Sequence, residues 1–119
     1  MILGFVVDGN PIPKARARVG KGRRFTPTRT KDYEALVKAH ARRAVKPGWP
    51  MDCTYEIALD FARATADRCD IDNLIKSVLD AMNGVVYDDD WQVSKLAVTK
   101  VVDRANPGVT VRVKAVQGE

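Results

Sequence analysis

Residues 54–84 read TYEIALDFARATADRCDIDNLIKSVLDAMNG and contain two successive periodicities of apolar residues. Over 54–62 apolar side chains alternate with small or acidic ones, which predicts a strand with one buried face. Over 71–82 the apolar residues recur every three or four positions, as they do along one face of a helix. Asn83 and Gly84 then supply residues that commonly end a helix. The stretch therefore predicts a strand that is followed, after a short polar connection, by an amphipathic helix.

The rest of the chain adds three strands and one helix around this unit. β-Branched and aromatic residues predict strands over 2–7, 93–103 and 109–116, and apolar residues at helical spacing predict a helix over 31–45. The turn residues at 104–108 predict that the last two strands form a hairpin. The order β-α-β-α-β-β indicates an α/β (α+β) fold, a two-layer sandwich with a mixed sheet and a C-terminal antiparallel hairpin.

Length and composition set the class of protein. The chain has 119 residues, of which 45% are hydrophobic and 29% charged, and this suits one soluble globular domain over residues 1–119. The longest apolar runs are far shorter than the roughly 20 residues that span a bilayer, and the first residues show no signal-peptide pattern. We therefore expect a cytoplasmic protein that makes no membrane contact.

Charge is divided unevenly along the chain. Residues 1–50 carry a net charge of +9 and residues 51–119 a net charge of −4, within an overall charge of +5. Basic residues concentrate in a Pro- and Gly-rich segment over 11–30, which predicts a functional loop that binds a polyanion such as DNA. A solvated basic surface is the alternative interpretation. The candidate DNA-binding residues are Lys14, Arg16, Arg18, Lys21, Arg23, Arg24 and Arg29.

Acidic residues cluster at the start of the predicted second helix and in the loop after it. Asp70 and Asp72 are two residues apart, so an extended lead-in would place both carboxylates on one side. Lys76 lies one turn farther along, and 88–90 adds three more aspartates. Carboxylates with a lysine are groups that bind Mg²⁺ and stabilise charge in phosphodiester hydrolysis. Helix capping, local ion pairs and a turn explain the same residues, and the local pattern alone does not decide.

Longer segments of the chain resemble a known family. RCDIDNLIKSVLDAMNG at 68–84 and VYDDDWQV at 86–93 are similar to the core signature of the RusA family of Holliday junction resolvases, the crossover junction endodeoxyribonucleases. GNPIPKARAR at 9–18 and FTP at 25–27 resemble phage- and prophage-borne members. The resemblance implies a homodimer that uses Mg²⁺, needs no organic cofactor, and nicks two opposed strands of a four-way DNA junction in recombination and repair.

The resemblance also implies roles for single residues. It makes Asp70, Asp72 and Asp90 the metal-binding and catalytic carboxylates, and Lys76 a catalytic residue that acts as a base or stabilises the phosphate. Asp90 matches the second aspartate of the family's D-D-x-Q motif, although the run of three aspartates leaves Asp89 as the alternative. A phage or a bacterium that carries a prophage is the implied source. Two further residues match the signature and are interpreted as structural support, namely Asn73 and Asp80.

Three functions fit these observations. A junction resolvase needs the carboxylates, the basic segment and a twofold axis that matches a four-way junction. A nuclease that cuts flaps or replication forks would use the same chemistry on DNA of a different shape. A non-catalytic basic DNA-binding protein would need the basic segment but not the carboxylates and their lysine, so the joint presence of these residues argues against it.

Overall fold

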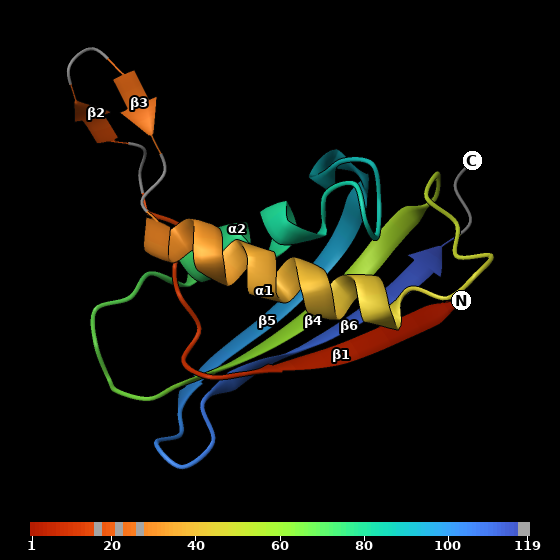
Figure 1. Cartoon of the computed structure of the whole chain (residues 1–119). Helices are drawn as coiled ribbons and strands as arrows, with labels where there is room; N and C mark the ends of the chain where they lie inside the picture. Colours follow the sequence, from red (N-terminus) through yellow and green to blue (C-terminus); the bar gives the residue numbers. More distant parts are fainter. Residues whose placement is uncertain (16–17, 21–22, 26–27, 117–119) are drawn as a thin grey trace.

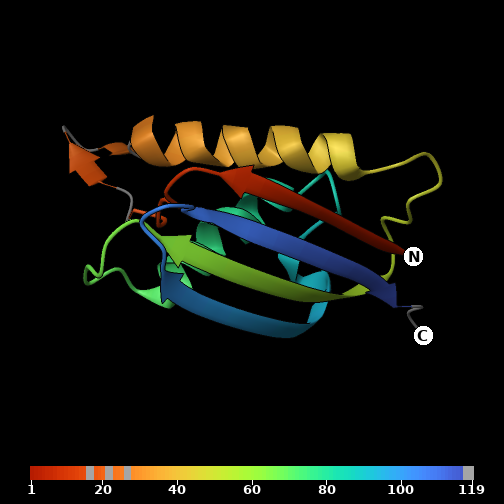
Figure 2. The same ribbon diagram turned by 90° about the horizontal axis from the view of Figure 1, so that it is seen from below.

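Two helices lie on one face of a four-stranded sheet, as Figures 1 and 2 show from two directions. The computed structural model describes residues 1–15, 18–20, 23–25 and 28–116. Within these residues, neither helix is long and apolar enough to cross a membrane. The elements in chain order are β1 (Ile2–Asp8), β2 (Arg18–Gly20), β3 (Arg23–Phe25), α1 (Thr28–Ala44), β4 (Thr54–Arg63), α2 (Ile71–Met82), the 3-10 turn η1 (Asp90–Gln92), β5 (Val93–Val102) and β6 (Gly108–Val116).

The sheet combines parallel and antiparallel pairing in the order β1-β6-β4-β5. β4 pairs in parallel with β5 and antiparallel with β6, and β6 pairs antiparallel with β1. The parallel strands β4 and β5 are joined through α2, since parallel neighbours need a long crossover connection. The mixed sheet and the two-layer α/β architecture that the sequence predicts are confirmed.

The last two strands run antiparallel, as predicted, but they are not direct neighbours, because β4 lies between them in the described sheet. The turn that joins them passes the ends of two other strands. Asp103 N donates to Arg63 O at the end of β4, and Gly9 N donates to Pro107 O. Every second residue of β4 is buried, whereas β5 is exposed along most of its length. β4, which has the more apolar face, therefore lies inside the sheet, and β5 lies at its edge.

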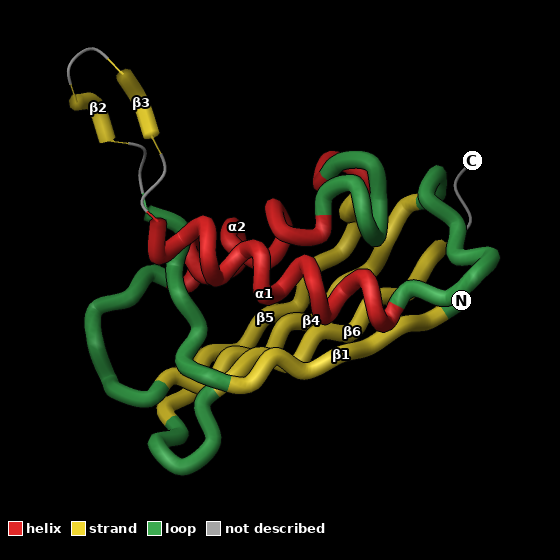
Figure 3. Tube along the Cα trace, in the orientation of Figure 1, coloured by secondary structure: helices red, strands yellow, loops and turns green. Residues whose placement is uncertain are grey.

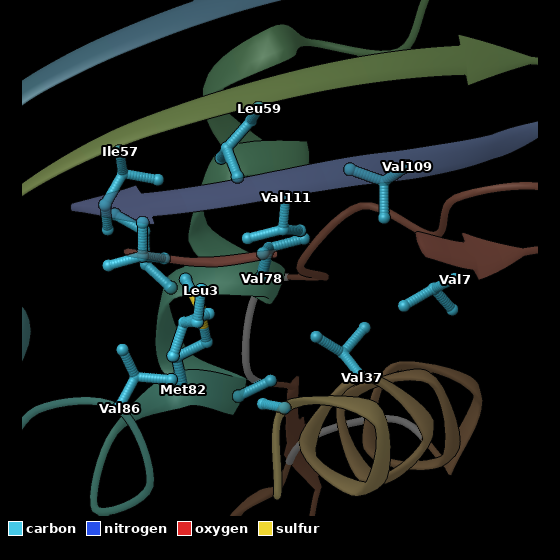
Figure 4. Packing of buried hydrophobic residues seen from close by; sticks show 14 of the residues in the cluster. Leu3, Val7, Val37, Ile57, Leu59, Val78, Met82, Val86, Val109 and Val111 are labelled. Atoms are coloured by element: carbon cyan, nitrogen blue, oxygen red, sulfur yellow. The ribbon is translucent and has the colours of Figure 1, made fainter. Parts of the chain in front are cut away.

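The hydrophobic core fills the space between the sheet and the helices (Figure 4). Its burial is the main force that holds the two layers together. Four residues of the predicted apolar stripe of α2 are buried, namely Leu74, Val78, Leu79 and Met82, whereas Ile75 is half-buried and Ile71 in the first turn is 38% exposed. The exposed first turn is also the one that carries Asp72. All residues of β4 that the sequence predicts to face inward are buried, namely Tyr55, Ile57, Leu59 and Phe61.

The basic segment over 11–30 contains regular structure that its sequence pattern did not predict. β2 and β3 form a small antiparallel sheet of their own, which stands apart from the two-layer body in Figure 3. α1 begins at Thr28, earlier than the predicted Lys31. Strands of three residues are too short to show apolar alternation. Of the predicted DNA-binding residues, those in β2 or β3 are Arg18, Arg23 and Arg24, and those outside the described residues are Arg16 and Lys21.

Three aromatic side chains fix the loop that follows α2. Tyr55 lies between Trp49 and Tyr87, with ring centroids 6.1 Å and 5.7 Å away. The Trp49 indole Nε1 donates to Val86 O at 2.8 Å, and the Tyr87 hydroxyl donates to Leu79 O at 2.9 Å. Because the polar tips of both rings have hydrogen-bond partners, their burial carries little penalty. The loop that leads to the three consecutive aspartates is thereby held against the core.

The pairing of β1 with β6 predicts a difference between two glycines. A Cβ added at Gly108 would lie 2.8 Å from Val7 O, whereas one added at Gly4 would lie 3.4 Å from Val111 O. We expect Gly108→Ala to lower the free energy of unfolding by about 1–3 kcal/mol through overpacking. Gly4→Ala is the matched control and should change it by less than about 1 kcal/mol. Urea denaturation measures both, and equal stabilities would contradict the close approach at Gly108.

Candidate active site

Lys76 connects two separate parts of the chain. Its ammonium Nζ lies 3.0 Å from Asp80 Oδ1 and 3.3 Å from Asp90 Oδ2. Asp80 lies one turn farther along α2, whereas Asp90 begins η1 on the far side of the loop. The hydrogen bond to Asp80 is the main cause of a raised pKa for Lys76; partial burial opposes the rise and Asp90 adds to it. Lys76 therefore carries a positive charge at neutral pH.

The position of η1 depends on Gln92, which is buried. The side-chain oxygen Oε1 of Gln92 accepts hydrogen bonds from the backbone N–H groups of Asp88 and Asp89, at 2.8 and 3.0 Å. Its Nε2 donates to two backbone carbonyls in the segment before β4, those of Met51 and Cys53, both at 2.9 Å. All the hydrogen-bonding positions of this amide are thus used, and the side chain connects the turn at 88–90 to the segment before β4.

Asp89 and Asp90 have different surroundings. Asp89 caps η1, because its Oδ1 accepts from Asp90 N at 2.7 Å in a capping box completed by Gln92. Asp90 instead turns a carboxylate oxygen toward Lys76. Of the two residues that the sequence left open, Asp90 is the one that the fold brings to the lysine.

Asp70 and Asp72 flank the start of α2, and both are exposed. Within the described residues, the Asp70 side chain makes no capping hydrogen bond to the helix. The Asp72 Oδ1 accepts a hydrogen bond from the next backbone N–H, that of Asn73, at 3.0 Å. Capping therefore does not account for Asp70, whereas Asp72 has a local hydrogen-bond partner.

The connection between β4 and α2 is held by side chains at both ends. The buried Arg63 guanidinium donates to Pro11 O and pairs with Asp67. Lys100 of β5 donates from Nζ to Cys69 O at 2.6 Å. These contacts fix the path of the chain immediately before the first candidate carboxylate.

The candidate carboxylates supply the hard oxygen ligands that Mg²⁺ prefers. Among the described residues, no three His, Cys, Asp or Glu side chains lie close enough together to hold a metal ion. Asp90 pairs with Lys76 instead. Mg²⁺ commonly takes only one or two carboxylates, and water and substrate phosphate complete its coordination. The donor set therefore fits Mg²⁺ in its chemistry, and a bound ion would share Asp90 with Lys76.

Lys14 and Arg29 are the candidate DNA-binding residues whose side chains the structure describes, and their surroundings differ. Arg29 is exposed in the first turn of α1. Lys14 pairs with Glu34 at 2.7 Å and with Asp80 at 3.3 Å. Burial lowers the pKa of Lys14, but the two carboxylates outweigh this effect, and the pKa is raised overall. Lys14 is therefore engaged within the protein, whereas Arg29 is presented to solvent.

The sequence pattern does not mark three residues of the site as functional. Asp80 contacts both Lys14 and Lys76, and its spacing of four from Lys76 is the signal for an ion pair on one helix face. Gln92 stands in the D-D-x-Q motif, but the sequence does not show that its side chain holds the turn in place. The burial of Arg63 had no local signal, because it depends on contacts with residues far away in the chain.

One hollow in the described part of the chain lies away from these residues. It has a volume of about 400 Å³, sits on the open face of the sheet, and is lined by Ile57, Ala58 and Ala97 among others. A phosphate on a bulky polymer needs open access, so the candidate site is the group of exposed charged side chains on α2 and η1 and not this hollow.

Similarity to known proteins extends over the candidate site. A family model described as Endodeoxyribonuclease RusA matches residues 8–114, which include α2, η1 and the basic segment. The chain belongs to the RusA endodeoxyribonuclease family. As a RusA-family protein it is an enzyme that cuts within DNA strands.

Two relatives match the chain over most of its length. The crossover junction endodeoxyribonuclease RusA of Aquifex aeolicus (strain VF5) is 30% identical, over 90% of this chain and 86% of that protein. The uncharacterized protein YqaN of Bacillus subtilis (strain 168) is 26% identical, over 94% of this chain and 95% of that protein. The similarity to the RusA family is therefore not confined to the aspartate motifs.

The different surroundings of Asp70 and Asp89 predict different effects on stability. We expect Asp89→Ala to lower the free energy of unfolding by about 1 kcal/mol, because it removes the cap of η1. Asp70→Ala should change it by less than about 0.5 kcal/mol, as exposed substitutions commonly do. The two variants serve as controls for each other in thermal or urea denaturation. If Asp70→Ala loses as much stability as Asp89→Ala, the capping interpretation of Asp70 is restored.

Proposed function

We propose that the protein is a Mg²⁺-dependent, structure-specific endonuclease that resolves four-way DNA junctions by paired nicks, in recombination and repair inside a bacterial host cell. The observation that carries the proposal is the contact between Lys76 and Asp90. It joins α2 to η1 and sets a positive charge beside a carboxylate at the surface. Membership of the RusA family supports DNA as the substrate, and similarity to the crossover junction endodeoxyribonuclease of Aquifex aeolicus supports a crossover junction.

Asp70, Asp72 and Asp90 are the residues that would hold Mg²⁺. When bound there, the ion would polarise the phosphate and make water a better nucleophile. The chain's contribution is to keep Asp70 and Asp72 exposed at the start of α2, where a substrate phosphate can complete the coordination. Gln92 accepts hydrogen bonds from the two residues before Asp90 and so fixes the backbone that carries Asp90. The Asp90 carboxylate would therefore lose little conformational freedom when the ion binds.

Lys76 supplies positive charge at the same place. Its side chain is 54% exposed, so the ammonium can reach a substrate phosphate while the stem stays on α2. A protonated lysine stabilises the negative charge that develops on the phosphate oxygens during hydrolysis. Of the two roles that the sequence left open for Lys76, its contacts with two carboxylates favour charge stabilisation over general base catalysis.

The basic segment and α1 supply a path for the DNA backbone. The start of α1 presents Arg29 and Lys31 to solvent, next to the arginines of β2 and β3 in the sequence. A groove between α1 and α2 is lined by Lys31 and Lys38, together with Glu34 and Asp80. Contacts of lysine and arginine with phosphate provide binding without sequence preference, and they weaken as salt rises. The basic residues would therefore bind the DNA, and α2 and η1 would cut it.

A homodimer would place two such sites about a twofold axis, which lets paired cuts occur in one complex with a symmetric junction. We expect light scattering at working concentrations to report about twice the chain mass of 13.2 kDa. The same measurement with junction DNA should report one dimer for each junction. A stable monomer that makes both nicks during one binding event would contradict the dimer.

The catalytic roles are tested by removing charge without changing size. We expect Asp70→Asn, Asp90→Asn and Lys76→Met each to lower the cleavage rate in Mg²⁺ by on the order of 100-fold or more, because each removes a charge that acts in the transition state. Binding to junction DNA without divalent metal should survive in all three variants. Asp88→Asn is the matched control, because Asp88 is exposed in the same turn and holds none of these roles.

The substrate is tested with four-way junction, flap and linear duplex DNA of matched sequence. Paired nicks in the junction, with slower cutting of the other two, are the expected result. Preferential cutting of the flap would replace the junction assignment by the flap or fork alternative. If the three variants cut as fast as the wild type, the site is wrongly assigned, and DNA binding without this site would be the interpretation left.

A further inference from the structure

Five side chains form a continuous series of ion pairs that crosses α1, α2 and η1. Lys14 Nζ lies 2.7 Å from Glu34 Oε2 on α1 and 3.3 Å from Asp80 Oδ2 on α2. Lys76 Nζ lies 3.0 Å from the other oxygen of Asp80 and 3.3 Å from Asp90 Oδ2 on η1. Asp80 is therefore shared, because each of its oxygens holds a different lysine.

Lys14 is fixed through its backbone as well as through its side chain. Its own N–H donates to Asn73 O on α2 at 2.8 Å, and the N–H of Ala15 donates to Thr30 Oγ1 on α1 at 3.3 Å. The Lys14 side chain is only 25% exposed. An ammonium has three protons to donate, and the two neighbouring carboxylates engage it. Lys14 is therefore held between the helices and is poorly placed to bind a DNA phosphate.

We propose that Lys14 is a positioning residue, which acts through Asp80 to hold the Lys76 ammonium in its place beside Asp90. This inference rests on the proposed function, in which Lys76 stabilises charge on the substrate phosphate. It replaces the role of Lys14 that the charge pattern of the basic segment suggested.

The physical reason lies in the sharing of Asp80. With Lys14 present, one oxygen of Asp80 is committed, so the carboxylate keeps its orientation and only the other oxygen faces Lys76. Without Lys14, both oxygens are free to turn toward Lys76, and the charge of Glu34 is no longer compensated. Both changes draw the Lys76 ammonium away from the substrate. A displacement of about 1 Å in a catalytic group costs on the order of 100-fold in rate.

The alternative is that Lys14 contacts phosphate directly, and the salt dependence of DNA binding separates the two roles. Each lost phosphate contact lowers the slope of log affinity against log salt by about 1. A positioning residue instead changes the cleavage rate at saturating protein and leaves the affinity and the slope unchanged. Arg16→Ala and Arg18→Ala in the basic segment are the reference variants, in which the slope should fall.

The experiment compares Lys14→Met, Lys14→Arg and the control Lys114→Ala, which alters an exposed lysine of β6. We expect Lys14→Met to lower the single-turnover cleavage rate 10–100-fold, with an affinity for metal-free junction DNA within about twofold of the wild type. Lys14→Arg keeps the charge and should restore most of the rate, and Lys114→Ala should match the wild type. A fall in affinity and salt slope in Lys14→Met, with an unchanged rate, would falsify the proposal.

The link through Asp80 is tested by a double-mutant cycle. If Lys14 acts only through Asp80, then adding Lys14→Met to the Asp80→Asn variant should lower the cleavage rate little further. Costs that multiply in the double variant would show that the two residues act separately and would overturn the proposal. Circular dichroism establishes that each variant is folded. If Lys14→Met is not, Lys14→Gln is the second variant; it also removes the charge beside Asp80, and the same signs are expected.

A spectroscopic readout keeps this proposal distinct from the proposed function. In protein with ¹³C-labelled lysines, the Lys76 Cε signal, identified by its loss in Lys76→Arg, should shift in Lys14→Met and stay in place in Lys114→Ala. If the wild type cuts junctions but this signal does not respond, positioning by Lys14 is wrong and the proposed function stands. If the wild type cuts no DNA while the signal responds, the proposed function fails and the coupling between the lysines stands.

Discussion

The burial of one side of α2 is the constraint on which the site depends. Leu74, Val78 and Met82 are fully buried against the sheet and α1. The helix cannot rotate or slide without exposing them, because protein interiors are close-packed. The polar side of α2 is thereby fixed as well, and it presents Asp72 and Lys76 to solvent. The charged groups are placed by apolar packing on the far side of the helix, and their own interactions refine their orientation.

Positive and negative side chains alternate around α2, and this alternation offsets the repulsion between the carboxylates. Carboxylates gathered at one point would repel one another. Here Lys14 and Lys76 lie between Glu34, Asp80 and Asp90, so each carboxylate of the series has a cationic neighbour. Partly exposed ion pairs of this kind add little to stability, typically about 0–1 kcal/mol. Their effect is to restrict the directions in which the lysines point.

The structure separates the parts that hold the candidate catalytic groups from the small sheet of the basic segment. Asp90 sits on η1, which Gln92 and the aromatic cluster around Tyr55 fix to the core. β2 and β3 instead pair with each other in a sheet of two short strands. Chemistry on phosphate requires groups held to within a fraction of an ångström, and rigid elements provide this. Binding along a phosphate backbone tolerates looser geometry, because the attraction of charges is not directional.

The sequence by itself determined the features that depend on neighbours in the chain. Local spacing predicts the inward face of β4 and the buried stripe of α2 that begins at Leu74. It also places Asp70 near Asp72 and predicts the order β-α-β-α-β-β. The resemblance to the RusA family added the candidate roles. Only the tertiary structure inserted β4 between β5 and β6, brought Asp90 to Lys76, and set Lys14 between two helices. These contacts join segments far apart in the chain, and their energies depend on how the apolar faces pack together, which local spacing does not encode.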